Sequence, residues 1–367
     1  MYPSFIVEYG VAPHHLSKEV FIGIVKWLRE TRVEAKHTGR KLEADALKIV
    51  INRIYGALND AMDYLYDPEC TYTVTINLQL LLCGLIEAFE LNNFDVLSAN
   101  TDGLLVRLPL NRQGVFKHIC NEWSVYSKLD LETEKFEKYC RSAVNDYIAV
   151  GYGFYDALQE YNRCGVWIDS KGNTYTTRQA IEDKFIKFKG YFLQDPEYNK
   201  GFVYPVVKKA LKEYFLYGVD ITEFIRNYIN TSRTAIYDYC FSQKVAGKYT
   251  TIYKTVRDGK PVYIKCQKHN RFYICKSGGG AITKAIVPDS DNIAYGDDIS
   301  GIVVEEEKSL VAGQRVALFN DYEYKEDYNL NYSFYINEAY KILYGNGKTG
   351  KGERRGINNN SNNLFGW

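Results

Sequence analysis

The sequence lacks the features that mark membrane and secreted proteins. No apolar stretch approaches the roughly 18 uninterrupted residues that a membrane-spanning helix needs. The first residues, Met1 to Ser4, begin neither a secretory signal nor a basic transit peptide. These absences argue against the membrane and secreted classes, and they predict a cytoplasmic protein with no membrane partner.

Spacings typical of metal sites and disulfide frameworks are missing as well. The eight cysteines include no close CxxC pair, and none of the five histidines shows a zinc-ligand spacing, so we expect reduced thiols. No period of about 20 to 50 residues recurs, which argues against a solenoid. Proline is scarce at 8 residues, whereas tyrosine is abundant at 33. Tyrosine rings pack on one side and hydrogen-bond on the other, which suits a polar binding surface.

The composition that is present is that of a folded protein with more than one unit. The 367 residues are 46% hydrophobic and 25% charged, which are globular values. The length exceeds that of a typical single domain. We therefore expect at least two packed units with a sizeable core.

Charge is distributed unevenly along the chain, although the net charge is only +1. Residues 224–284 contain 12 Lys and Arg against 2 Asp and Glu, a local net charge of +10. Residues 285–338 contain 3 against 12, a local net charge of −9. Two interpretations stay open: a phosphate-facing element beside a solvated acidic one, or two segments that pair with each other.

The first hundred residues predict a helical hairpin followed by a β-hairpin. Helical spacing over residues 17–37 and 41–58 indicates two helices, which we expect to form an antiparallel hairpin. Residues 77–91 predict a mostly buried helix because they are apolar on nearly every face. Two β-prone runs in residues 94–107 are separated by an Asp-Gly turn, which predicts a β-hairpin. The apolar residues whose spacing predicts the first helix are Val20, Ile24, Trp27 and Leu28.

The remaining elements are predicted as a mixture. Residues 117–129 indicate a helix, 137–150 and 174–190 supply strands and connections, and 204–218 and 220–229 look helical. Residues 249–275 look β-like, and Gly278 to Gly280 is expected to be a flexible loop. The tail from 345 to 363 is poor in apolar residues and is expected to be disordered.

Two stripes of polar residues on the predicted helical hairpin suggest a nucleotide site. Lys48, Asn52, Tyr55 and Gly56 lie on one helix face and present a cation, an amide, an aromatic plane and a gap. On the preceding helix Arg32 and Lys36 are spaced to form a second cationic stripe, as a triphosphate requires. The alternative is an ordinary core helix with a solvated lysine and a terminal glycine.

The tip of the predicted β-hairpin carries Asp102. A carboxylate held at the end of two strands has a fixed position, which a Mg²⁺ site needs. The alternative is a turn whose residues serve the backbone conformation alone.

The order and spacing of these pieces resemble a family B DNA polymerase, most like those of bacteriophages. Met1 to Ser4 is similar to the end of the first palm motif (DxxSLYPS). Residues 48–56 are similar to the fingers motif (KxxxNSxYG), and residues 100–103 to the second palm motif (DTDS). Lys187 to Gly190 is similar to the basic element that grips primer–template backbone. The resemblance covers about residues 1–340.

The sequence departs from the family pattern at three positions. Asn100 stands where the second palm motif usually has Asp, and Arg53 stands where the fingers motif usually has Ser. The Asp of the first palm motif lies four residues before the position of Met1, outside this chain. The resemblance therefore implies that an upstream part supplies this Asp and any exonuclease.

The fold implied by the resemblance is an α+β right-hand architecture, truncated at its N-terminus. Its palm is an antiparallel sheet with packed helices. The expected parts are a palm entry (1–15), a fingers helical hairpin (16–58), the palm (59–200), the thumb (201–344), and a disordered tail with a C-terminal peptide (345–367).

The resemblance also implies roles for individual residues in two-metal nucleotidyl transfer from a dNTP to a primer. Asp102 would bind two Mg²⁺ ions together with a carboxylate from outside this chain. The expected nucleotide-binding residues are Tyr2, Arg32, Lys36, Lys48, Asn52, Tyr55 and Gly56, with Tyr2 excluding a 2′-hydroxyl. The expected contacts to primer–template DNA are Thr101, Lys187, Lys189, Lys244 and Lys248.

The last residues, Leu364, Phe365 and Trp367, resemble a peptide that binds a sliding clamp, although a tail that folds back on its own domain is as common. The rival to the polymerase interpretation is a catalytically inactive module, derived from a polymerase, that binds nucleic acid or assembles with a partner.

Overall fold

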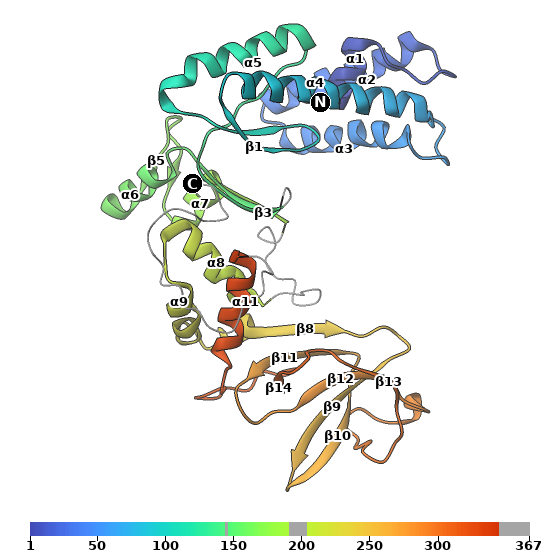
Figure 1. Cartoon of the computed structure of the whole chain (residues 1–367), viewed down its shortest axis with the longest axis vertical. Helices are drawn as coiled ribbons and strands as arrows, with labels where there is room; N and C mark the ends of the chain where they lie inside the picture. The colour runs from blue at the N-terminus through green and yellow to red at the C-terminus, as the bar shows by residue number, and fades with distance from the viewer. Residues whose placement is uncertain (144–145, 191–203, 345–367) are drawn as a thin grey trace. The chain divides into compact units, whose positions relative to one another are not determined.

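The computed structural model describes residues 1–143, 146–190 and 204–344. The chain divides into two compact units, Met1–Glu134 and Lys135–Trp367 (Figure 1). Both units contain helices and strands, which confirms the prediction of a mixed helix and sheet protein. The boundary at residue 134 falls inside the predicted palm part, and the division into palm, fingers and thumb stays a prediction.

The first unit is mainly helical. Side-chain caps fix two of its helix starts, because Ser17 and Asp67 accept hydrogen bonds from the backbone N–H groups of Val20 and Cys70. Its elements are α1 (Tyr2–Tyr9), α2 (Lys18–His37), α3 (Lys41–Ala57), α4 (Pro68–Leu91), β1 (Asp95–Ala99), β2 (Leu104–Arg107), the 3₁₀ helix η1 (Leu110–Arg112) and α5 (Gln113–Ser127).

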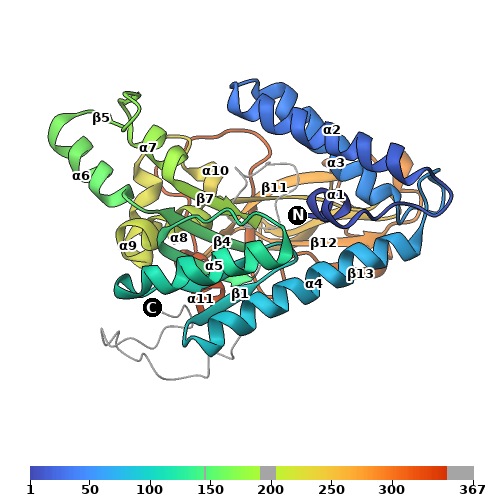
Figure 2. The ribbon, with the colours of Figure 1, turned by 90° about the horizontal axis from the view of Figure 1, so that it is seen from above.

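The predicted helical hairpin is confirmed. Helices α2 and α3 pack side by side and are joined by a short turn, as both views show (Figures 1 and 2). The turn contains Gly39 at φ 75°, a left-handed conformation that glycine adopts at no steric cost.

The four apolar residues whose spacing predicted α2 do not share its buried face, because only Leu28 among them is buried. Val20, Ile24 and Trp27 are exposed by 50% or more, and the buried face consists of Phe21, Val25, Leu28 and Ala35. Apolar residues cover more than half of the first part of this helix, so spacing alone does not single out one face. The contacts of α2 with α1 and α3 decide which face is buried.

The prediction of a mostly buried helix at 77–91 is also wrong. Helix α4 begins earlier, at Pro68, and buries a single stripe that contains Val74, Leu78, Leu82 and Leu85. Tyr72, Ile76, Leu80 and Leu91 on the same helix are exposed. Apolar residues therefore line both a core face and a surface face of α4.

Helix α4 is also the one helix among the described residues that is long and apolar enough to cross a membrane, by length and composition alone. Its mean hydropathy is 1.6 over the most apolar window. A helix that contributes to the core of a soluble protein passes the same test, so the predicted location in the cytoplasm stays a prediction.

The predicted β-hairpin is confirmed as β1 paired antiparallel with β2, with a register shift between Val96 and Ser98. Helices α4 and α5 lie side by side next to this hairpin (Figures 1 and 2). One hydrophobic cluster joins α1, α2, α4 and α5, with Phe5, Val74, Phe89 and Trp123 among its buried members. The hairpin tip is therefore carried on a packed base.

The second unit begins with a small antiparallel sheet in the order β3-β4-β7. Its buried face holds Cys140, Ile148, Val150 and Ile186. The elements of this part are β3 (Phe136–Ala143), β4 (Asp146–Gly151), α6 (Phe154–Cys164), β5 (Trp167–Ile168), β6 (Thr174–Tyr175), α7 (Arg178–Phe185) and β7 (Ile186–Lys189).

The rest of the second unit combines helices with two further antiparallel sheets, ordered β10-β9-β12-β13 and β14-β11-β8. The predicted helices near 204 and 220 and the β-like region at 249–275 are confirmed. The elements are α8 (Pro205–Tyr217), α9 (Ile221–Asn227), η3 (Tyr228–Asn230), α10 (Ile236–Tyr239), β8 (Cys240–Lys244), β9 (Thr250–Arg257), β10 (Lys260–Cys266), β11 (His269–Cys275), β12 (Ala281–Ile286), η4 (Ser290–Asn292), β13 (Glu305–Ser309), β14 (Arg315–Leu318) and α11 (Tyr332–Tyr344).

The glycines at 278–280 are not the flexible loop that the sequence suggests. Gly280 exchanges backbone hydrogen bonds of 2.9 and 2.8 Å with Val316. A Cβ atom at Gly280 would lie 2.2 Å from the carbonyl oxygen of Lys254. The glycine is therefore required by a close backbone approach between the two sheets.

The acidic and basic segments pair with each other at two points. Lys248 Nζ lies 3.2 Å from Glu306 Oε2, and Lys254 Nζ lies 2.6 Å from Glu307 Oε1. The interpretation that the two segments pair is confirmed at these positions. All eight cysteines are free, as the sequence predicts.

Candidate functional site

A pair of stacked tyrosines joins two of the sequence motifs in the first unit. The rings of Tyr2 on α1 and Tyr55 on α3 have centroids 4.0 Å apart and planes 9° from parallel. The hydroxyl groups of Tyr55 and Thr75 form a hydrogen bond of 2.6 Å. The pKa of Tyr2 is raised by burial first, then by the neighbouring Tyr55 and by the charge of Asp102. The stack therefore brings the N-terminal motif, the α3 motif and Asp102 into one neighbourhood.

Asp102 lies at the exposed tip of the β1–β2 hairpin. The backbone N–H of Asn100 donates to the Gly103 carbonyl at 3.0 Å, and the N–H of Asp102 donates to the Asn100 side-chain oxygen at 3.1 Å. Asn100 thus shapes the turn with an oxygen that an Asp would also have. The Asp102 carboxylate has no hydrogen bond or ion pair among the described residues, and Thr101 beside it is exposed.

The charges of several side chains act on the N-terminal amine of Met1. Burial lowers the pKa of this amine, the charge of Asp102 raises it, Arg29 and Arg32 lower it, and Glu132 raises it. These opposing effects show that all four side chains lie within electrostatic reach of the same atom. The charges of Asp102 and Arg32, which come from distant parts of the sequence, therefore both act on the Met1 amine.

Helix α2 presents a stripe of three cations, spaced by three and four residues. Lys36 Nζ lies 3.6 Å from Glu132 Oε1, and Arg29 lies 3.7 Å from Glu8 and 3.9 Å from Asp130. The Nε atom of Arg32, between them, is buried and has no hydrogen-bond partner among the described residues. A buried N–H group without a partner is costly, so an anion at this position would satisfy it.

The stripe on α3 is oriented toward solvent. Lys48, Asn52 and Gly56 are exposed, and neither Lys48 nor Asn52 makes a side-chain hydrogen bond or ion pair within the described part of the chain. Arg53, which departs from the family pattern, is held by Asp60 and Asp63 at 3.2 and 2.8 Å. Carboxylates of the loop after α3 therefore pair with this arginine.

The second unit carries a separate basic and aromatic face on the β3-β4-β7 sheet. The register places Lys189 opposite Tyr147 and Lys187 opposite Ala149, so both lysines lie on the face opposite to Ile148 and Ile186. Their ammonium groups lie 5.9 Å from the rings of Tyr147 and Phe136 respectively. Rings of Tyr139 and Tyr147 stack at 4.9 Å on this face.

The two other predicted DNA contacts lie at the start of the β region. Lys244 is exposed at the end of β8, and Lys248 is paired with Glu306. The predicted clamp-binding residues Leu364, Phe365 and Trp367 lie outside the described residues.

Sequence reasoning missed several members of these groups. Arg29 could have been found, because it precedes Arg32 by three residues on the same helix. Glu132 could not, since no local pattern shows that it meets Lys36 at a distance of almost a hundred residues along the chain. Tyr139 and Tyr147 needed the strand register.

The described residues do not by themselves supply a complete set of metal ligands. No group of three His, Cys, Asp or Glu among them could hold a metal ion. Asp102 offers a single open carboxylate, so a Mg²⁺ ion at this place would need oxygen ligands from a nucleotide or from another segment.

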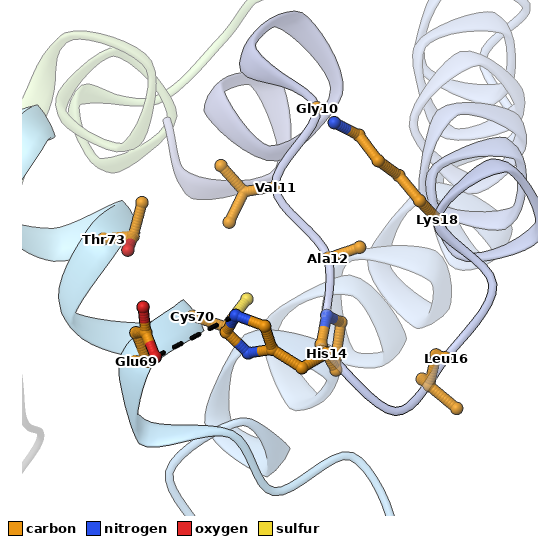
Figure 3. Close-up of a pocket in the computed structure, with 10 residues that line it drawn as sticks. Gly10, Val11, Ala12, His14, Leu16, Lys18, Glu69, Cys70 and Thr73 are labelled. Atoms are coloured by element: carbon orange, nitrogen blue, oxygen red, sulfur yellow. Dashed lines mark ion pairs between the residues drawn. The ribbon is translucent and has the colours of Figure 1, made fainter.

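An open cavity of about 320 Å³ lies elsewhere in the first unit, between the loop after α1 and the start of α4 (Figure 3). Lys18 reaches toward Gly10 on one side of it, and His14 faces Glu69 on the other, at 3.9 Å. None of the sequence-predicted site residues lines this cavity.

No family model and no curated protein matches the chain. A solved structure described as the family B DNA polymerase from the hyperthermophilic archaeon Pyrobaculum calidifontis superposes with a TM-score of 0.46 and 13% identity, over 94% of this chain and 44% of that chain. The chain thus spans less than half the length of that polymerase. A likeness of this size assigns neither a family nor a function to this chain.

Proposed function

We propose that the chain is the nucleotide- and DNA-binding part of a family B DNA polymerase, and that template-directed synthesis requires a carboxylate from outside this chain. The proposal is supported chiefly by the stacking of Tyr2 on Tyr55, which joins two of the motifs, and by the charges of Asp102 and Arg32, which both act on the Met1 amine. These residues come from three sequence motifs in the order expected for that family.

In the proposed site the α2 and α3 cations bind the triphosphate. The partnerless Nε of Arg32 donates to a phosphate oxygen, and Lys36 and Lys48 add charge. Asn52 orients the nucleotide, and Gly56 leaves room beside it. Tyr55, held by Thr75, packs near the nascent base pair, and Tyr2, stacked on it, excludes a 2′-hydroxyl.

Asp102 is the proposed metal-binding and catalytic carboxylate. Two Mg²⁺ ions, when bound, would supply activation of the primer 3′-hydroxyl and stabilisation of the leaving pyrophosphate. The turn made by Asn100 and Gly103 holds the Asp102 backbone in place, and its open carboxylate is available as a ligand. The second carboxylate belongs to an upstream part of the polymerase.

The basic face of the second unit is the proposed site for duplex DNA. Lys187 and Lys189 bind backbone phosphates, which gives affinity that is independent of sequence and falls with salt. Lys244 and, once it leaves its partner Glu306, Lys248 add contacts, and Thr101 of the first unit is a separate proposed contact. The C-terminal residues are proposed to bind a sliding clamp, and the protein is proposed to act in the cytoplasm.

The direct test is primer extension with the chain co-expressed with an upstream fragment that supplies the missing Asp. We expect extension with Mg²⁺ and dNTPs, and its loss in Asp102→Ala. Asp95→Ala is the matched control, because Asp95 lies on the same hairpin, is exposed and pairs with Arg107. Unchanged extension in Asp102→Ala removes Asp102 from the mechanism.

The lack of a complete metal site among the described residues favours one alternative, an inactive nucleic-acid-binding or assembly module. This module would bind duplex DNA and show no extension with any upstream fragment. The same experiment therefore separates the two functions.

A further inference from the structure

The segment that follows α5 is fixed to the core at its start and carries carboxylates outward. Tyr9 donates a hydrogen bond of 3.0 Å to the Ser127 carbonyl, and the Ser127 hydroxyl accepts one of 3.2 Å from the Leu129 N–H. Leu129 is buried, and Leu131 packs against the same cluster. Between and after these anchors, the side chains of Asp130 and Glu132 are 95% and 88% exposed. The alternation places leucines inward and carboxylates outward.

These carboxylates meet the cations that the nucleotide is proposed to use. Glu132 lies 3.6 Å from Lys36, and Asp130 lies 3.9 Å from Arg29. Glu132 also acts electrostatically on the Met1 amine, together with Asp102 and Arg32. The segment therefore lies beside the proposed triphosphate position, with its negative charges directed at the α2 cations.

We propose that residues 130–132 form an acidic latch that occupies the α2 cations until a polyphosphate displaces it. This inference rests on the proposed function, because it assigns those cations to the nucleotide. In the latched state Lys36 pairs with Glu132, and Arg29 pairs with Asp130 and also with Glu8 of α1, whereas the buried Nε of Arg32 has no hydrogen-bond partner among the described residues.

A ligand with several charges needs little free energy to displace the latch. Exposed ion pairs contribute little because both partners are solvated when separated. A triphosphate replaces two such pairs with charge-assisted hydrogen bonds and also accepts a hydrogen bond from Arg32. The free energy of these new bonds exceeds that of the ion pairs that are broken. The latch lowers nucleotide affinity by the free energy of the pairs that must open first.

The test uses inorganic tripolyphosphate as the probe and calorimetric titration of the full chain at low salt. The latch variant is Asp130→Asn combined with Glu132→Gln. The matched control is Glu30→Gln combined with Glu34→Gln, which removes the same charge from carboxylates on α2 that pair with Lys26 and Arg40. Both variants change exposed side chains, and thermal melts verify that they fold.

We expect the latch variant to bind tripolyphosphate about three- to tenfold more tightly than the unmodified chain, from two exposed pairs, and more tightly than the control. Equal affinities in the latch variant and the control would overturn the latch. If Arg32→Ala still weakens binding in that case, the proposed nucleotide site stands without it. If no variant binds tripolyphosphate, both the site and the latch are wrong.

Discussion

The helical hairpin of the first unit and the helices of the second unit are both rich in cations, but they hold them differently. In the second unit, buried carboxylates neutralise the cations: Lys212 lies 2.6 Å from Glu182, and Lys209 lies 2.7 Å from Asp238. On the hairpin the partners of Arg29 and Lys36 are exposed acids, and Arg32 Nε has no partner among the described residues. The two regions therefore differ in the burial of the carboxylates that pair with their cations, and not simply in the number of charges.

The largest expected effect comes from breaking a cation–carboxylate pair of the second unit. Glu182 is 3% exposed and binds Arg178, Lys212 and the Tyr217 hydroxyl. Glu182→Gln leaves Lys212 without its charge partner and Arg178 with Glu213 alone, and because both cations are partly exposed we expect a loss of about 1–3 kcal/mol in the free energy of unfolding. Urea denaturation measures it, and Glu132→Gln on the hairpin is the control that should change stability little.

The contribution of the Glu182 carboxylate to stability depends on pH. Burial raises the pKa of Glu182, but hydrogen bonds from Lys212, Tyr217 and Arg178 more than reverse this and place it below the ordinary 4.5. A group with a lowered pKa in the folded state stabilises it above its unfolded pKa and loses this effect as pH falls through the folded value. The difference in stability between the unmodified chain and Glu182→Gln should therefore shrink below pH 4.5. If the stability difference between the two proteins stays constant across this pH range, the pKa of Glu182 is not lowered in the folded state.

The next effect concerns ligand binding on the hairpin. Arg32→Ala removes the partnerless donor, and we expect about 10- to 100-fold weaker binding of tripolyphosphate, the range given by loss of a hydrogen bond between charged groups. Lys26→Ala is the control, because Lys26 is on the same helix and pairs outward with Glu30. Equal losses in the two variants would show that α2 attracts the anion by general charge alone.

A smaller effect is expected for duplex DNA at the second unit. Lys189→Ala should reduce the slope of log affinity against log salt by about 0.9, as the loss of one phosphate contact does. Lys254→Ala should leave the slope unchanged, because Glu307 already neutralises that lysine at 2.6 Å. A slope that falls equally in both would mean that paired and unpaired lysines bind DNA alike.

The sequence predicted the positions of helices and strands better than it predicted which face of each one is buried. Capping residues and turn chemistry specified the helical hairpin and the β1–β2 hairpin, since both depend on neighbours within a few residues. The exposed Val20, Ile24 and Trp27 and the half-exposed α4 were not predicted, because the buried face depends on which helices pack against it. The tight approach at Gly280 likewise depends on two sheets that meet only in the fold.

The candidate site shows the same limit. Motif order led us to expect Asp102, Arg32, Tyr2 and Tyr55 in a common site; the structure stacks Tyr2 on Tyr55, and the common site stays a prediction. The carboxylates that pair with the α2 cations could not be predicted from the sequence. Glu132 meets Lys36, and Asp130 meets Arg29, through contacts between residues far apart in the chain, which no spacing rule describes.

The central claim is that Asp102 and the α2 cations bind one nucleotide between them. A crystal structure of the chain soaked with a non-hydrolysable deoxynucleoside triphosphate and Mn²⁺ tests it most directly. The account predicts an anomalous Mn²⁺ peak at ligand distance from the Asp102 carboxylate, with a phosphate oxygen bound to Arg32 Nε. Density for the nucleotide in the cavity beside Lys18 instead, with the hairpin cations still paired to Asp130 and Glu132, would contradict it.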